Sequence, residues 1–259
     1  MVIEFYLSNK EGCNWYSISQ THDPGNMLTW LEEEFMKMEQ TGKKALIISH
    51  FQPGGGACLN AWSERYRELI ERYLNLTISN FFGNTHKEQI YLITGTLNKT
   101  AIHVYHESGS LTSFNNHNPQ FRILNLDYET GYLVKGHKGF LNITGANIGN
   151  TEWKKQYELT EEYKMTEFSQ ESFNNLTLRF RDTPGLVTQY IWNFEGTPFP
   201  LEEYNRGFKK CRKNTYCTAI NFLNFETNHC RNSQRYNFSC NLTSSIPEIA
   251  LCLFLVLVD

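Results

Sequence analysis

Two short segments of the sequence each place a histidine directly after a run of apolar residues. His50 follows the run from Ala45 to Ser49, and His86 closes the segment Phe81-Phe82-Gly83-Asn84-Thr85-His86. A neutral imidazole is a good ligand for zinc and other borderline metals, and the end of a strand fixes its direction. Two such residues are only part of a ligand set, so the pattern predicts half of a metal site. The alternative is that each histidine is simply a polar residue in a turn.

The residues around the two histidines predict a strand, a helix and a second strand. Ala45 to Ser49 is a continuous apolar run, typical of a strand buried on both faces. A crossover through a helix makes the two strands parallel, so His50 and His86 are expected at the same edge of a sheet. Ligand sites in open α/β sheets gather at that edge. The apolar stripe of the intervening helix consists of Trp62, Tyr66, Leu69, Ile70 and Tyr73.

The pattern changes along the rest of the chain. A turn at residues 23–26 with a good N-cap precedes an amphipathic helix that continues to Gly42. Beyond residue 88, short runs broken by Gly and Asn turns predict largely antiparallel strands at 90–94, 101–106, 121–126 and 132–135. From Glu152 onward, charged and helix-compatible segments around Trp153, Tyr157 and Tyr163 predict a mostly helical region that ends in a cysteine cluster.

Composition limits the classes of protein that this chain can represent. With 259 residues and 40% hydrophobic residues, the chain has ample material for a packed core. The formal net charge is −3, and acidic and basic residues are interspersed. The sequence therefore has no basic stripe of the kind that neutralises phosphates, and nucleic acid is not an expected partner.

Cysteines and glycosylation sequons predict a secretory or lysosome-like compartment. Four of the 7 cysteines crowd into one short stretch without histidines at zinc-finger spacing, which disulfides explain better than zinc. These four are Cys211, Cys217, Cys230 and Cys240. Candidate glycosylation sites are Asn75, Asn98, Asn142, Asn175, Asn237 and Asn241.

The two ends of the chain do not carry the signals that this compartment usually requires. Met1 to Leu7 has no basic region, long apolar region or cleavage site of a signal peptide. Ile249 to Val258 is wholly apolar but too short for a transmembrane helix, which needs about 20 residues. We expect a buried strand or a frayed tail there, with a glycolipid-anchor signal as the alternative.

Several strings of residues resemble the second half of acid sphingomyelinase and its acid-sphingomyelinase-like phosphodiesterase relatives. These proteins belong to the calcineurin-like metallophosphoesterases. The likeness extends over nearly the whole chain, up to about Cys230. It is carried by Ile47-Ile48-Ser49-His50 with Pro53-Gly54, by Trp62, Tyr66 and Arg72-Tyr73, by Phe81-Phe82-Gly83-x-Thr85-His86, by Asn118-Pro119-Gln120-Phe121-Arg122 and by Leu141-Asn142-Ile143-Thr144.

The resemblance implies an α/β fold of the α+β type. Residues 1–150 would form the C-terminal half of a metallophosphoesterase sandwich, with a β-α-β unit followed by antiparallel strands. Residues 151–245 would form a mostly helical, disulfide-bearing C-terminal region, and residues 246–259 an apolar tail. Cys13 with Cys58, and Cys217 with Cys230, resemble disulfides of the family. Cys211 with Cys240 is a further candidate pair, Cys252 has no assigned partner, and the connectivity stays open.

The resemblance also implies a two-zinc centre. His50 matches a ligand of one zinc and His86 a ligand of the other. Asn84 departs from the family, which usually has histidine at this position, and an amide oxygen is a poorer zinc ligand. The family's Asp-x-His, bridging Asp and Gly-Asn-His motifs are absent from this sequence. We therefore assign no catalytic residue here. The other histidines, including His103 and His106, are expected to be surface or structural residues.

Two functions follow as competing hypotheses. The first is a phosphodiesterase that hydrolyses sphingomyelin or a related phosphate ester, represented by a chain that lacks its N-terminal half and is inactive alone. Both the missing signal peptide and the missing metal motifs would follow from that single loss. The second is a secreted glycoprotein without catalysis that uses the half-fold as a binding module, which the substitution at Asn84 favours.

Overall fold

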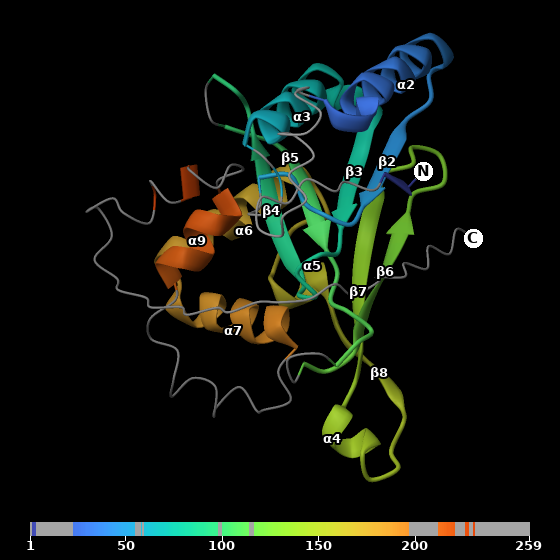
Figure 1. The fold of residues 1–259 in the computed structure, drawn as a ribbon. Coiled ribbons are helices and arrows are strands. Elements are labelled where there is room, and N and C mark those ends of the chain that lie inside the picture. The colour runs from blue at the N-terminus through green and yellow to red at the C-terminus, as the bar shows by residue number, and fades with distance from the viewer. Residues whose placement is uncertain are drawn as a thin grey trace.

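The computed structural model describes residues 2–3, 23–54, 58, 60–97, 100–113, 117–196, 212–220, 226–227 and 230. This part of the chain contains two β-sheets and the helices that pack on them (Figure 1). The larger sheet has, in spatial order, the strands β1 (Val2–Ile3), β2 (Ala45–Ser49), β3 (Thr77–Phe82), β5 (Ala101–Glu107) and β4 (Gln89–Thr94). The smaller sheet has the order β6 (Gln120–Leu126), β7 (Leu133–Leu141) and β8 (Trp153–Glu158). The mixed α/β fold class predicted from the sequence is confirmed.

The strand, helix and strand around the two histidines form as predicted. Helix α3 (Asn60–Arg72) connects β2 to β3, and the two strands pair in parallel, with Ile48 opposite Phe81. β3 also pairs in parallel with β5, whereas β4 and β5 are antiparallel. The parallel pairing of β5 differs from the expectation of a largely antiparallel set. A pairing between strands this far apart in sequence depends on tertiary packing and leaves no local signal.

Helices α2 (Met27–Thr41) and α3 cover one face of the larger sheet. α2 follows the short 3₁₀ helix η1 (Pro24–Asn26) and ends at Gly42, whose φ of 68° is the left-handed conformation that often terminates helices. A second 3₁₀ helix, η2 (Leu74–Leu76), leads from α3 into β3. The core on this face consists of Leu28, Leu31, Phe35, Ala45, Ile47, Cys58, Trp62, Tyr66, Ile70, Tyr73, Phe82, Tyr91, Ile93 and Tyr105.

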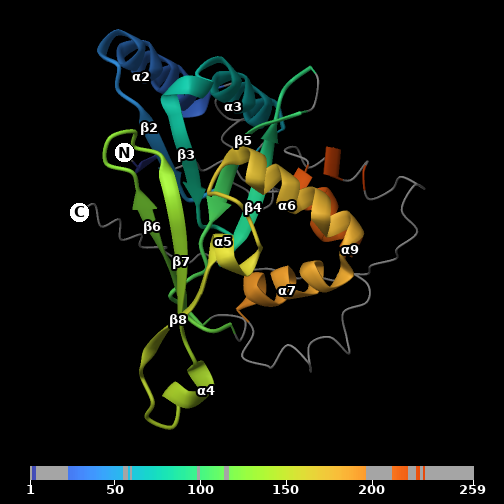
Figure 2. The same cartoon turned by 180° about the vertical axis from the view of Figure 1, so that it is seen from behind.

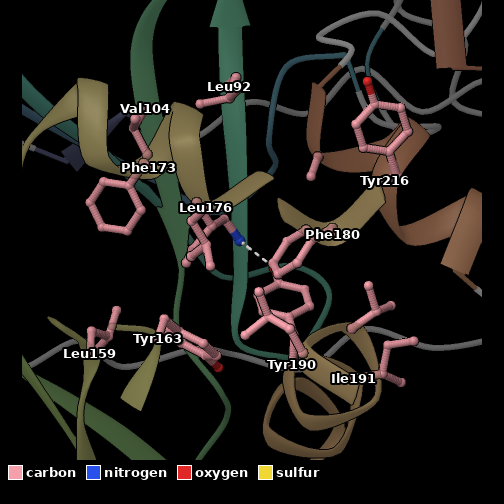
Figure 3. Close-up of a cluster of buried hydrophobic side chains, with 14 of the residues drawn as sticks. Leu92, Val104, Leu159, Tyr163, Phe173, Leu176, Phe180, Tyr190, Ile191 and Tyr216 are labelled. Atoms are coloured by element: carbon pink, nitrogen blue, oxygen red, sulfur yellow. Dashed lines mark hydrogen bonds between the residues drawn. The ribbon is translucent and has the colours of Figure 1, made fainter. Parts of the chain in front are cut away.

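Helices α6 (Gln170–Asp182), α7 (Pro184–Glu195) and α9 (Arg212–Ile220) form a second core on the opposite face. Because successive strand residues point to opposite faces, Ile90 and Leu92 of β4 lie in this core while Tyr91 and Ile93 lie in the other. Figure 3 shows the aromatic and aliphatic side chains of α6 and α7 gathered against the strands. The backbone N–H of Ile90 also donates a hydrogen bond to the hydroxyl of Tyr190 (2.9 Å), which ties α7 to β4.

The smaller sheet is an antiparallel meander. β6 pairs with β7, as the sequence predicts, and β7 pairs with β8. The connection between β7 and β8 contains the short helix α4 (Ile143–Ala146) and projects away from α6, α7 and α9 (Figures 1 and 2). Helix α5 (Leu159–Glu162) follows β8 directly. Its N-terminus is capped by Glu158, whose carboxylate accepts hydrogen bonds from the backbone N–H groups of Thr160 and Glu161 (both 3.1 Å).

Two local predictions are wrong. Trp153 and Tyr157 lie in strand β8 and not in a helix, because pairing with β7 outweighs the weak helical preference of the charged segment. The helical region begins only at Leu159. β2 is not buried on both faces, since Leu46 and Ile48 are only half-buried. Among the described residues, the core formed by α6, α7 and α9 contains side chains of β4 and β5 but none of β2.

Helix α9 carries the disulfide between Cys217 and Cys230. The disulfide-bearing character of the helical region is therefore confirmed. In the part of the chain that the structure describes, no helix is both long and apolar enough to cross a membrane. The tail at 246–259 lies outside the described residues, and the proposed division at residues 150 and 245 stays a prediction.

Candidate metal site

The backbone brings the two histidine segments into direct contact. The carbonyl oxygen of His50, one residue beyond β2, accepts hydrogen bonds from the backbone N–H groups of Gly83 (3.1 Å) and Asn84 (3.0 Å). Gly83 and Asn84 in turn follow β3, the parallel neighbour of β2. The prediction that both segments lie at the carboxyl edge of one sheet is therefore confirmed at the level of the backbone (Figure 1).

His86 lies in a constrained turn. Its φ of 61° is in the left-handed region that residues other than glycine rarely adopt. The N–H of His86 donates to the carbonyl of Gly83 (3.4 Å), and its carbonyl accepts from the N–H of Ser110 (3.2 Å). Partial burial lowers the pKa of the His86 imidazole. A neutral ring is the form that a metal requires.

The other two positions of the predicted ligand set are also half-buried at this edge. The ring of His50 packs edge-on against the ring of Phe51, with 4.7 Å between the centroids. Asn84 lies in the turn between Gly83 and His86. Two imidazoles suit zinc as part of a ligand set, whereas the amide oxygen of Asn84 is a poorer zinc ligand. Within the described residues, no group of three or more His, Cys, Asp or Glu side chains is arranged to hold a metal ion.

A buried carboxyl group that the sequence analysis did not identify lies beside the turn. Glu107 is the last residue of β5, pairs with Phe82 at the end of β3 and is fully buried. Its Oε2 accepts a hydrogen bond from the hydroxyl of Thr85 (2.7 Å). Burial raises the pKa of Glu107 to about 8, with the Thr85 hydrogen bond acting in the opposite direction. The group is therefore largely protonated at neutral pH.

A second buried carboxylate, also not identified from the sequence, anchors the end of the same turn. Glu88 lies between the turn and β4, and its carboxylate contacts the side chains of Arg122, Lys138 and Tyr157. Burial alone would raise the pKa of Glu88. The positive charges of Arg122 and Lys138 and the hydrogen bonds from Tyr157 and Arg122 outweigh it, so this pKa lies below its ordinary value. Nothing local in the sequence marks Glu88, because its partners lie on three other strands.

The two histidines of β5, His103 and His106, lie in the interior. Nε2 of His103 is 2.9 Å from the carbonyl oxygen of Thr77, and its Nδ1 interacts with the backbone of Val104. The ring of His106 contacts the rings of Phe81, Phe168 and Phe173. Burial lowers the pKa of both histidines. The sequence predicts that these two histidines are either structural or surface residues. Both are buried, which confirms the structural alternative.

Comparison with known proteins identifies the family to which this chain belongs. No family model matches the chain. The chain is 32% identical to sphingomyelin phosphodiesterase 2 of Caenorhabditis elegans over 225 residues, which cover 84% of this chain and 36% of that protein. This chain belongs to the acid sphingomyelinase family.

Other relatives from the acid sphingomyelinase family extend the comparison. Human sphingomyelin phosphodiesterase is 29% identical over 80% of this chain, which corresponds to 33% of the human protein. The human cyclic GMP-AMP phosphodiesterase SMPDL3A is 24% identical over 85% of this chain and 51% of its own length. The chain thus spans between about a third and a half of the length of these relatives.

The other residues singled out from the sequence are placed as follows. Cys58 is buried and has no disulfide partner among the described residues, while Cys13, Cys211, Cys240 and Cys252 lie outside them. The predicted pairing of Cys13 with Cys58 stays a prediction. Asn75, Asn142 and Asn175 are exposed, as glycosylation requires, and Asn98, Asn237 and Asn241 lie outside the described residues.

Proposed function

We propose that this chain is part of a zinc-dependent phosphodiesterase of the acid sphingomyelinase family. The observation that carries the proposal is the meeting of the His50 and His86 segments at one sheet edge, through the hydrogen bonds of Gly83 and Asn84 to the His50 carbonyl. The similarity to sphingomyelin phosphodiesterases supports a phosphodiester substrate. Sphingomyelin or a related phosphate ester is the substrate class proposed.

In this proposal, His50 and His86 hold zinc, with Asn84 as a weak additional ligand. Bound zinc would polarise the phosphoryl oxygens and lower the pKa of a bound water. The residues of this chain supply direction and favour the required protonation state. Partial burial lowers the pKa of the His86 imidazole and so favours its neutral form, and the His50 carbonyl fixes the turn that carries this ring. The further metal ligands and the proton donor for the leaving group would come from an N-terminal half outside this chain, so we expect the chain alone to be inactive.

Zinc titration of the chain by equilibrium dialysis tests the metal site. We expect at most one zinc per chain, with affinity lowered about tenfold or more in His50→Ala and in His86→Ala, because each substitution removes one ligand. His137→Ala is the matched control, since His137 lies on β7 in the other sheet. Equal affinity in all four proteins, or no binding in any, would exclude the site.

A complementation assay tests the activity. The chain is combined with the N-terminal part of the Caenorhabditis elegans relative, and hydrolysis of sphingomyelin and of a chromogenic phosphodiester is followed with and without zinc. We expect zinc-dependent hydrolysis that is lost in His86→Ala and absent from either part alone. Assembly of the two parts without any turnover would contradict the phosphodiesterase proposal.

Asn84 is the observation that favours the alternative, a secreted glycoprotein without catalysis that uses the half-fold for binding. The variant Asn84→His separates the two proposals. Because imidazole binds zinc better than an amide does, Asn84→His should raise zinc affinity in either case. Under the enzyme proposal the unaltered complemented protein already turns over substrate. Turnover that appears only in Asn84→His would favour the binding module. The exposed sequons and the Cys217–Cys230 disulfide support a secreted or lysosome-like location for both.

A further inference from the structure

Glu88 links the turn that carries His86 to all three strands of the smaller sheet. Tyr157 of β8 donates its hydroxyl to Oε2 of Glu88 (2.5 Å), and Nζ of Lys138 on β7 lies 3.2 Å from the same oxygen. The guanidinium of Arg122 on β6 donates to Oε1. One carboxylate therefore receives one partner from each strand of the second sheet.

This cluster is buried, so its members depend on one another. The Glu88, Arg122 and Lys138 side chains are exposed by 4%, 4% and 2%. A charge that loses its partner in such a place keeps its full desolvation penalty, which strongly disfavours opening the cluster. Lys138 also donates to the backbone carbonyl of Asn193, and Asn193 donates to Oε1 of Glu162 (2.7 Å). The cluster is thereby continuous with helices α5 and α7.

The turn between β3 and Glu88 is short and held at several points. It runs from Gly83 to Lys87 and contains the left-handed residue His86. The N–H groups of Gly83 and Asn84 are bonded to the neighbouring strand end, and the N–H of Ser110 is bonded to the His86 carbonyl. Glu88 fixes the remaining end. A non-glycine residue stays in a left-handed conformation only where its surroundings determine it.

We propose that Glu88 is a positioning residue for the His86 ligand: its contacts with Arg122, Lys138 and Tyr157 hold the end of the turn and so fix the direction of the His86 imidazole. This inference rests on the proposed function, because it assigns His86 to a metal. Glu88 would act from outside the coordination sphere, because its carboxylate contacts side chains of the smaller sheet. Residues that orient a ligand from outside the coordination sphere typically change metal affinity by 10- to 100-fold.

Two substitutions test the inference in the full chain. Glu88→Gln keeps the shape of the side chain but removes its charge, and Tyr157→Phe removes only the hydroxyl that binds Glu88, so it should fold even if the first variant does not. We expect zinc affinity to fall about 10- to 100-fold in Glu88→Gln and about threefold to tenfold in Tyr157→Phe. The visible spectrum of bound Co²⁺ should shift in both variants, because the ligand geometry changes.

Amide hydrogen exchange gives a readout that needs no metal. Exchange at Gly83, Asn84 and Ser110 should accelerate about tenfold in Glu88→Gln, while exchange in α2 stays unchanged. Glu158→Gln is the matched control, because Glu158 is a carboxylate at the end of β8 that caps α5 instead of holding the turn. It should leave zinc affinity and exchange in the turn unchanged.

The outcomes separate this inference from the proposed function. If the unaltered chain binds zinc and both variants bind it equally well with unchanged exchange in the turn, the positioning role is wrong and the metal site stands. If the unaltered chain binds no zinc, the proposed metal site is wrong. Accelerated exchange in Glu158→Gln equal to that in Glu88→Gln would show a general loss of structure and would also overturn the positioning role.

Discussion

Glu107 should make the stability of the chain depend on pH in a way that a single substitution removes. Its carboxyl group is fully buried at the end of β5, and burial raises its pKa from the ordinary 4.5 to about 8. Between these two values the folded chain holds a proton that the unfolded chain has lost. The free energy of unfolding therefore decreases as pH rises from 4.5 to 8, and the contribution of Glu107 is fully present only below 4.5.

The magnitude follows from the two pKa values. Each pH unit in this interval costs about 1.4 kcal/mol, so the interval from 4.5 to 8 gives a ceiling of about 5 kcal/mol. That is a large share of the about 5 to 15 kcal/mol typical of folded domains. Glu107→Gln cannot ionise in either state, and its amide oxygen still accepts the hydrogen bond of Thr85. The variant should match the parent near pH 4.5 and exceed its stability by several kcal/mol at pH 8.

Urea unfolding of the parent and of Glu107→Gln, followed by circular dichroism between pH 4.5 and 8.5, measures this difference. The buried histidines His103 and His106 act in the opposite direction: burial lowers their pKa, so their contribution is lost as pH falls below about 6.5. Both proteins contain them, and the subtraction cancels their effect. A difference in unfolding free energy that stays constant across the pH range would refute the argument, because it would mean that Glu107 ionises alike in the folded and unfolded chain.

Two further substitutions test the packing around the site and the C-terminal helices. Tyr66→Phe removes the hydroxyl that donates a hydrogen bond to Oδ1 of buried Asn80 (2.5 Å). The substitution should lower the unfolding free energy, measured by urea unfolding, by about 1 to 3 kcal/mol. An unchanged unfolding free energy would mean that water replaces this hydrogen bond. Cys217→Ser should lower the unfolding free energy by about 3 kcal/mol, because the disulfide to Cys230 closes a loop with a sequence separation of 13. This loss of stability should vanish when both proteins are compared under reducing conditions. A loss that persists there would point to packing of Cys217 instead.

The elements nearest the candidate site were those best predicted from the sequence. The helical spacing of Trp62, Tyr66 and Ile70 predicts α3, and these residues are fully buried beneath it. A helix between two apolar runs implies parallel strands and so predicts that His50 and His86 lie at one edge, which the parallel pairing of β2 with β3 confirms. The helical assignment of Trp153 and Tyr157 failed because strand β8 is stabilised by its partner β7 and not by its own residues.

The sequence by itself determined the local elements, the shared edge of His50 and His86 and the family to which the chain belongs. Only the tertiary structure revealed Glu107 and Glu88, since the state of a carboxyl group depends on what surrounds it in space. Glu107 is kept largely protonated by burial beside Thr85, whereas Glu88 is kept charged by Arg122 and Lys138 from two other strands. Periodicity records which face of an element is apolar, but it carries no information on which charges from distant strands meet in the interior.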